Sequence, residues 1–149
     1  MDRRARRKPG PSAYSARVGN ERNLELLRGA YAEWSRGDFS RDYMWDPETQ
    51  FIISGVEQRT YVGPGGVKEG WFDFLSAWED FRVEGVDFIE GKPDDTYLVL
   101  VHLRGRGKGS RVPIEADTAN VAVVRDGKIV RFELFWDRDA ALAAAGLAP

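Results

Sequence analysis

The sequence contains no cysteine and only one histidine, His102. Disulfides and thiolate metal sites are therefore excluded, and a histidine-based metal site is not expected. We expect no cofactor, and a reducing cytoplasm is the simplest location for a protein without cysteine. The longest apolar runs, such as residues 97–101, are far too short to span a bilayer, so no membrane association is expected.

Positive charge is concentrated in the first twenty residues, and acidic residues outnumber basic ones in the rest of the chain. That segment carries six basic residues and one acidic residue, and because the whole chain has a net charge of −2, the remaining 129 residues carry −7. An acidic body is a poor candidate for nucleic-acid binding, and we expect no such partner. We interpret residues 1–19 as a basic leader without regular structure, since Pro9, Gly10 and Pro11 disfavour it. The alternative is an arm that binds nucleic acid or a membrane surface.

The first strong periodic signal predicts an amphipathic helix that starts near Asn20 or Asn23 and stops at Gly37. Its apolar stripe has the spacing i, i+3, i+7 and i+10, and consists of Leu24, Leu27, Tyr31 and Trp34. Each large side chain that is fully buried contributes about 1.5–3 kcal/mol, so this stripe is expected to face a core.

The remaining pattern predicts helices before strands. A short helix is expected over 40–44, a brief strand over 51–53 and, after the breaker cluster 63–66, a helix over 67–78. Long strands are expected over 81–89 with a bend at Gly85, and over 97–106, 112–124 and 128–136, followed by a helix over 138–146. The order predicts one α+β domain over 20–147, with about three N-terminal helices on the concave face of a curved, mostly antiparallel sheet and a short C-terminal helix.

Four segments carry a resemblance to a known family: residues 23–38 (NLELLRGAYAEWSRGD), 61–71 (YVGPGGVKEGW), 105–110 (GRGKGS) and 125–142 (RDGKIVRFELFWDRDAAL). In this order and spacing they resemble the SnoaL-like branch of the nuclear transport factor 2 and ketosteroid isomerase superfamily. The resemblance implies a cone with one pocket, and a homodimer formed through the outer sheet face. It does not imply one function, because this fold hosts many chemistries.

The three positions that match the catalytic residues of the ketosteroid isomerases hold different residue types here. The resemblance places Ala30 at the position of the isomerases' catalytic tyrosine, with Tyr31 next to it. It places Ile53 at the position of their general base and Asn120 at that of their oxyanion-binding acid. Without a base at Ile53, no residue would abstract the proton of a ketosteroid. We therefore exclude ketosteroid isomerase activity.

The apolar part of the pocket transfers better. The resemblance implies ligand-binding positions in the first helix, the predicted strand 51–53, the third predicted helix and the last strand: Tyr31, Trp34, Ile53, Trp71, Phe74, Phe132, Leu134 and Trp136. Phe132, Leu134 and Trp136 also share one strand face by alternation. The alternative is that these side chains only form the core.

Asn120 and His102 are the polar candidates for catalysis. An amide can donate to a carbonyl oxygen, and a histidine can carry a proton near neutral pH. Asp117 and Glu133 are weaker candidates, although SnoaL-type polyketide cyclases use an acidic residue, because alternation places them on the opposite strand face from Asn120 and Leu134. The basic hairpin at Arg104–Arg111 is interpreted as a solvated turn.

Two functions stay open from the sequence. One is an isomerase, cyclase or hydratase acting on a small, largely apolar molecule. The other is a noncatalytic ligand-binding or dimerisation module of the same fold. A pocket that contains both His102 and Asn120 would favour the enzyme, and a pocket without ionisable side chains would exclude it.

Overall fold

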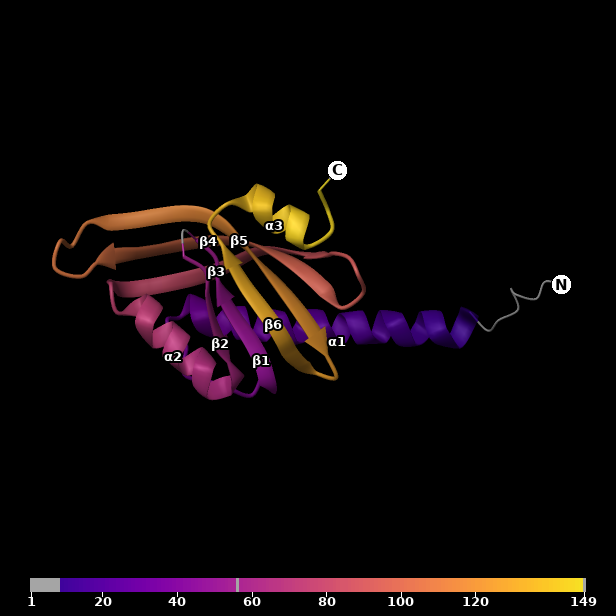
Figure 1. Ribbon diagram of the computed structural model, residues 1–149. Coiled ribbons are helices and arrows are strands. Elements are labelled where there is room, and N and C mark those ends of the chain that lie inside the picture. The colour runs from indigo at the N-terminus through magenta and orange to yellow at the C-terminus, as the bar shows by residue number, and fades with distance from the viewer. Residues whose placement is uncertain (1–8, 56, 149) are drawn as a thin grey trace.

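Six strands form a single mixed sheet with helices on both of its faces (Figure 1). The computed structural model describes the backbone of residues 9–55 and 57–148, with side chains from residue 19 onward. The elements in chain order are α1 (Pro9–Ser35), β1 (Trp45–Ile53), β2 (Arg59–Val62), α2 (Gly63–Leu75), β3 (Trp78–Glu90), β4 (Thr96–Gly107), β5 (Pro113–Arg125), β6 (Lys128–Phe135) and α3 (Arg138–Ala144). The strand order is β2-β1-β6-β5-β4-β3, and only the β1–β6 pair is parallel.

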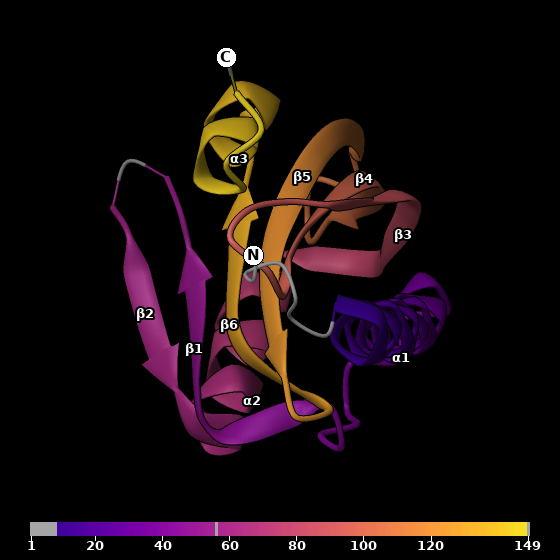
Figure 2. The ribbon, with the colours of Figure 1, turned by 90° about the vertical axis from the view of Figure 1, so that its right-hand side faces the viewer.

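The sheet bends around α1 and α2, while α3 lies on the opposite face (Figure 2). The α+β class and the curved, mostly antiparallel sheet are confirmed, but the predicted three N-terminal helices are wrong. Residues 40–42 form no helix, because the Asp38 carboxylate accepts hydrogen bonds from the Ser40 N–H and hydroxyl and so holds a local turn. Across residues 9–55 and 57–148, no helix is long and apolar enough to cross a membrane.

Helix α1 begins at Pro9, well before the expected start at Asn20 or Asn23. Proline is tolerated in a first helical turn, where its missing N–H would have no intrahelical partner. The predicted leader 1–19 therefore overlaps this helix, and its first eight residues lie outside the described part of the chain. The helix stops where predicted, at Gly37, whose φ of 84° suits glycine.

Helix α2 begins inside the predicted breaker cluster, with Pro64 in its first turn, and ends at Leu75 rather than at residue 78. Gly70 allows this helix to approach β1 closely. A Cβ atom at Gly70 would lie 2.8 Å from the Phe51 ring and 3.0 Å from the Tyr61 ring. The absence of a side chain at this position thus sets the distance between α2 and the sheet.

The long strands lie close to their predicted ranges, and the bend at Gly85 is confirmed as a register shift between Gly85 and Asp87. The turn between β5 and β6 is also confirmed, with φ angles of 51° at Asp126 and 74° at Gly127 that fit a two-residue hairpin. The sequence interpretation missed β2, and it missed most of β1, which starts at Trp45.

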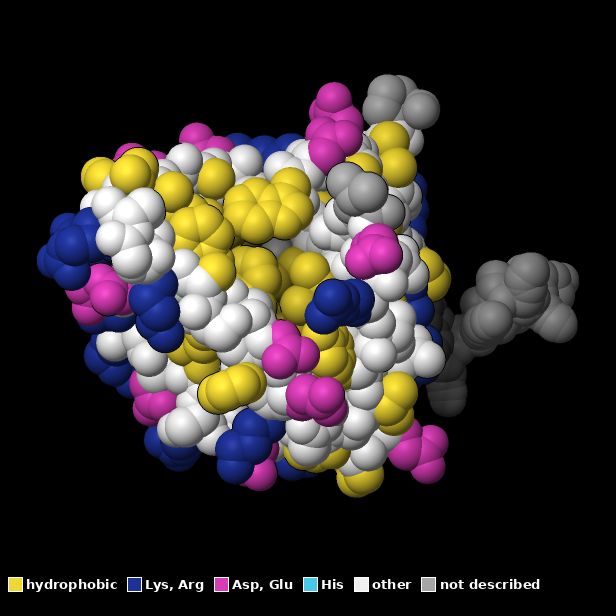
Figure 3. Space-filling model, turned by 60° about the vertical axis from the view of Figure 1, so that its left-hand side comes forward, with side chains coloured by type: hydrophobic (Ala, Val, Ile, Leu, Met, Phe, Trp, Pro, Cys, Tyr) yellow, Lys and Arg dark blue, Asp and Glu magenta, His cyan; other side chains and the backbone are white. Residues whose placement is uncertain are grey.

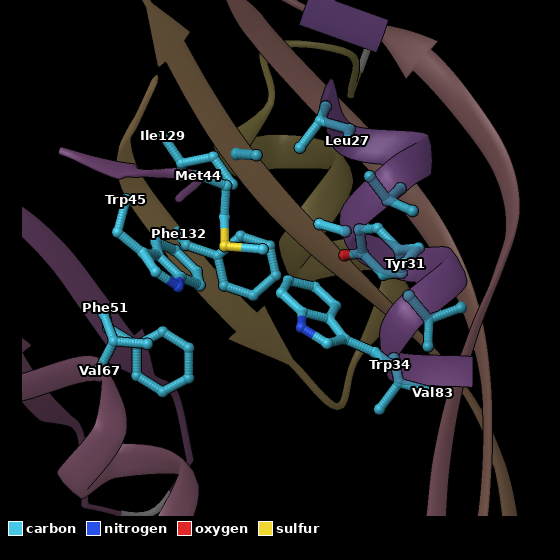
Figure 4. Packing of buried hydrophobic residues seen from close by; sticks show 14 of the residues in the cluster. Leu27, Tyr31, Trp34, Met44, Trp45, Phe51, Val67, Val83, Ile129 and Phe132 are labelled. Atoms are coloured by element: carbon cyan, nitrogen blue, oxygen red, sulfur yellow. The ribbon is translucent and has the colours of Figure 1, made fainter. Parts of the chain in front are cut away.

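The core is dominated by aromatic rings on the concave side of the sheet (Figure 4). Trp34, which is 1% exposed, has its ring centroid within 6.4 Å of five other rings. Those rings belong to Tyr31, Phe39, Trp45, Trp71 and Phe132. The predicted stripe of the first helix is therefore confirmed as the side that packs on the sheet.

Asn20 and Asn23 fasten α1 to β4 rather than capping the helix. The Tyr97 hydroxyl donates to Asn20 Oδ1 at 2.7 Å and accepts from Asn23 Nδ2 at 3.0 Å.

We expect Tyr97→Phe to lower the free energy of unfolding by about 1–3 kcal/mol, because the substitution removes both bonds and leaves amide groups in the protein with fewer partners. Urea denaturation measures this change. Tyr61→Phe, which removes a solvent-exposed bond of 3.2 Å to Asp73, is the control and should change stability by less than about 0.5 kcal/mol. Equal losses in the two variants would contradict the assignment.

Candidate functional site

A pocket lies between the concave face of the sheet and α2, with its mouth beside the end of β6. Figure 3 shows hydrophobic side chains gathered around a hollow on one face of the molecule. The pocket measures about 360 Å³ including its open mouth. Its lining comes from α2 and five strands, and consists of Ile53, Trp71, Phe74, Phe81, Val83, Val101, Leu103, Thr118, Asn120, Leu134, Phe135 and Trp136.

Among the side chains that the structure describes, the lining has no ionisable group, and most of its surface is aromatic or aliphatic. The enclosed inner part is narrow, with room for about one water molecule. Phe74 and Trp136 stand near each other at 6.3 Å between ring centroids, and Trp136 is 46% exposed. A ligand larger than a few atoms therefore has to displace these two rings, of which Trp136 is the less confined.

Two polar side chains, Thr118 and Asn120, enter the pocket from the same face of β5, and both are buried. Asn120 Nδ2 donates a hydrogen bond of 2.7 Å to the Tyr31 hydroxyl on α1. In the part of the chain that the structure describes, no other side-chain bond to Asn120 is found. Its Oδ1 and the second hydrogen on Nδ2 thus remain available to a ligand.

Tyr31 stands behind Asn120 and does not itself line the pocket. It is 2% exposed and packs edge-on against Trp34 and Phe88. Burial raises the pKa of Tyr31 far above its usual value, against the smaller opposing effect of the Asn120 bond. The hydroxyl therefore stays protonated, and the base of the pocket is neutral at any physiological pH.

The Trp71 indole supplies a second polar group that the structure leaves unused. Its Nε1 is buried and has no hydrogen-bond partner among the described residues. A buried donor without a partner costs about 1–3 kcal/mol, so a bound water or ligand that accepts from this group would be stabilised.

His102 lies on the other side of the sheet. Its neighbours on β4, Val101 and Leu103, face the pocket, and alternation turns His102 outward. There Nδ1 donates to the Asp117 carboxylate at 2.9 Å, and Nε2 lies 3.8 Å from Glu115. The hydrogen bond from His102 lowers the pKa of Asp117 below its ordinary value. The structure therefore does not bring His102 and Asn120 together at one pocket, because the sheet separates them.

The family model of the SnoaL-like domain matches residues 27–132, which is most of the chain. The protein belongs to the SnoaL-like domain family. No curated protein matches the sequence.

Several solved structures share this SnoaL-like fold. A protein from Jannaschia sp. CCS1, described as a candidate SnoaL-like polyketide cyclase, has a TM-score of 0.67 at 15% identity, over 87% of this chain and 94% of that one. TerC, co-crystallised with polyporic acid, has a TM-score of 0.66 at 20% identity, over 83% and 97%. A protein with a ketosteroid isomerase-like fold from Catenulispora acidiphila DSM 44928, in complex with trimethylamine, has a TM-score of 0.64 at 15% identity, over 84% of this chain and 94% of that one. At these identities the likeness shows the fold alone.

Within this SnoaL-like pocket, six of the residues expected at the site line the cavity: Ile53, Trp71, Phe74, Asn120, Leu134 and Trp136. Trp34, Tyr31 and Phe132 do not, because they lie in the core beneath it. The sequence interpretation missed Phe81, Val83, Val101, Leu103, Thr118 and Phe135. Alternation along β3 and β4 identifies the inward face of those strands, but not which part of that face a helix leaves uncovered.

The acidic side chains considered for catalysis face outward, as alternation predicted. Glu133 accepts a hydrogen bond of 2.6 Å from the Ser54 hydroxyl and forms an ion pair of 3.3 Å with Arg131. Asp117 pairs with His102 on the same outer face. Among the side chains described, no group of three His, Cys, Asp or Glu residues is placed to hold a metal ion.

The Tyr31–Asn120 bond links α1 to the sheet at the base of the pocket. We expect Tyr31→Phe and Asn120→Ala each to destabilise the protein, and a double-mutant cycle with the combined variant to give a coupling energy of about 1 kcal/mol. The free energy of unfolding in urea is measured for all four proteins. Additive losses would show that the bond contributes nothing to stability.

Proposed function

We propose that this SnoaL-like protein binds one small, uncharged and largely apolar molecule, without transforming it. The observation that carries the proposal is the composition of the pocket: aromatic and aliphatic side chains, two neutral polar residues and no ionisable group. Such a lining stabilises apolar ligands and penalises charged ones, which would lose their hydration without gaining a partner. A carbonyl or hydroxyl group of the ligand would bond to Asn120.

The absence of a proton carrier favours binding over catalysis. Isomerisation, cyclisation and hydration all move protons, and a side chain that moves them must lie within hydrogen-bond reach of the substrate. The resemblance to the isomerases matches Ile53 to the position of their base, and Ile53 lines the pocket as an aliphatic residue. The nearest titratable hydroxyl, that of Tyr31, is buried behind Asn120 and keeps its proton.

The lack of an ionisable lining side chain argues against an enzyme whose base is a side chain. A second candidate, an enzyme that polarises a carbonyl group and leaves the proton to water, has one observation in its favour. The bond of 2.7 Å from Asn120 to Tyr31 orients a neutral amide donor toward the pocket, and neutral donors stabilise developing oxyanions. One protein of similar fold is described as a candidate polyketide cyclase and another as a candidate isomerase. In such an enzyme, water would have to take the proton. Conversion of a bound ligand would favour this candidate over simple binding.

Binding of acetophenone, a small neutral aromatic ketone, tests the proposal. We expect quenching or a shift of tryptophan fluorescence, since Trp71 and Trp136 line the pocket. Asn120→Ala should weaken binding about fivefold to tenfold, because one hydrogen bond contributes about 1–1.5 kcal/mol. Affinity should not change between about pH 5 and 9, where no lining residue titrates.

His102→Ala is the control, since His102 lies across the sheet and should leave the affinity unchanged. Unchanged affinity in Asn120→Ala would exclude the role of Asn120. A pH dependence that disappears in His102→Ala would overturn the assignment of that residue to the outer face.

A homodimer through the outer sheet face remains a proposal. Such a dimer needs an accessible outer sheet face, and α3 covers part of that face, where Ala141 and Ala145 pack on Leu98, Ala119 and Val121. The uncovered part carries the charged groups around His102 and Arg131.

Light scattering tests the dimer and is expected to give the mass of two chains. Asp117→Arg is expected to favour dissociation of the dimer into single chains. A monomer at high concentration would contradict the proposal.

A further inference from the structure

A second hollow lies at the opposite side of Trp71, between the segment that joins α1 to β1 and the start of α2. Figure 2 places both segments at the same end of the sheet. The hollow measures about 510 Å³ including its open mouth, against about 360 Å³ for the pocket described above. Its lining consists of Phe39, Ser40, Arg41, Asp42, Trp45, Pro64, Gly65, Val67, Lys68 and Trp71. This hollow therefore has more room, and unlike the first pocket it carries charged groups.

The floor of this second hollow is aromatic. Phe39, Trp45 and Trp71 line it, and Trp45 and Trp71 are almost fully buried. The rings are held by the core, since Phe39 and Trp45 both stack on Trp34 with interplanar angles of 14° and 16°. A flat ring would meet a preformed apolar surface here, which reduces the conformational entropy lost on binding.

The rim of the hollow favours an anion. Arg41 is engaged by Glu33 at 3.6 Å, but Lys68 is exposed and forms no ion pair with any side chain that the structure describes. The rim also holds one acid, Asp42, so the lining has a formal charge of +1 before the Glu33 carboxylate that pairs with Arg41 is counted. Lys68 is thus the cation available to a ligand. It precedes Trp71 by three residues, a spacing that places both side chains on the same face of α2.

The start of α2 reinforces the preference for negative charge. Its N-cap residue, Val62, makes no side-chain hydrogen bond to the helix, and the first turn contains no acidic residue. The first N–H groups of a helix have no intrahelical acceptor, and the helix dipole adds positive potential there. Gly65 lines the hollow, and a Cβ atom at this position would meet nothing within 4 Å, so a ligand can come close to the backbone.

From these features we propose that the second hollow binds a small aromatic carboxylate. The ring would lie on Phe39, Trp45 and Trp71, and the carboxylate would face Lys68 and the first turn of α2. The charge of the ligand separates this site from the neutral pocket on the other side of Trp71. The inference does not rest on the function proposed for that pocket.

Benzoate and benzamide form a matched pair of probes, since they differ chiefly in charge. We expect titration of the ¹⁵N-labelled protein with benzoate to give saturable shifts of the amide signals of Gly65, Gly66 and Lys68, and the shifts caused by benzamide at these residues to be much weaker. Raising the salt concentration should weaken the binding of benzoate.

Lys68→Ala is expected to weaken benzoate binding about threefold to fivefold, and Lys68→Glu to abolish it. Lys108→Ala removes an equally exposed lysine on a distant turn and should leave the affinity unchanged. Asn120→Ala should also have no effect, because Asn120 lines only the first pocket. The proposal is overturned if benzoate gives no saturable shifts, if benzamide shifts the signals of Gly65, Gly66 and Lys68 equally, or if Lys68→Glu binds benzoate like the unchanged protein.

Discussion

The packing of Trp34 against the concave face of the sheet is the interaction on which the rest of the structure depends. Its indole contacts rings from α1, the following loop, β1, α2 and β6, so one side chain joins elements that are far apart in sequence. Loss of a buried tryptophan of this kind costs about 3–5 kcal/mol, a large part of the stability of a small domain. Trp71, which contacts Trp34, lines both hollows, and the second hollow is also lined by Phe39 and Trp45, which stack on Trp34.

The pocket lining is uncharged because the side chains of β4, β5 and β6 alternate between the two faces of the sheet, and the ionisable ones lie on the outer face. The ionisable residues near the middle of these strands, His102, Asp117 and Glu133, face outward and pair with one another or with Ser54 and Arg131. The inward positions next to them are aliphatic, aromatic or neutral polar. The sheet thus separates a charged face from an uncharged one, and the carboxylates have polar or charged partners while the cavity stays apolar.

Much of this fold was predictable because its signals are local. The helical spacing of Leu27, Tyr31 and Trp34, the alternation of the long strands and the turn at Asp126 and Gly127 each need only a few neighbouring residues. The parallel pairing of β1 with β6 was not predicted, since it joins residues about eighty positions apart. Periodicity also could not distinguish residues that line the pocket from residues that are buried in the core. It shows that Trp34 and Phe132 face inward. Whether such a side chain borders a cavity or is covered by other side chains depends on how closely α2 approaches the sheet.

That approach is set at Gly70, a residue that lines neither hollow. Phe51 and Tyr61 occupy the space in which any larger side chain at this position would have to fit. Substitution would push α2 away from β1 and carry Trp71 and Phe74 with it, so the width of the cavity is a property of a contact outside it. A substitution at Gly70 can therefore change the size of ligand that the cavity accepts, without any change in the residues that contact the ligand.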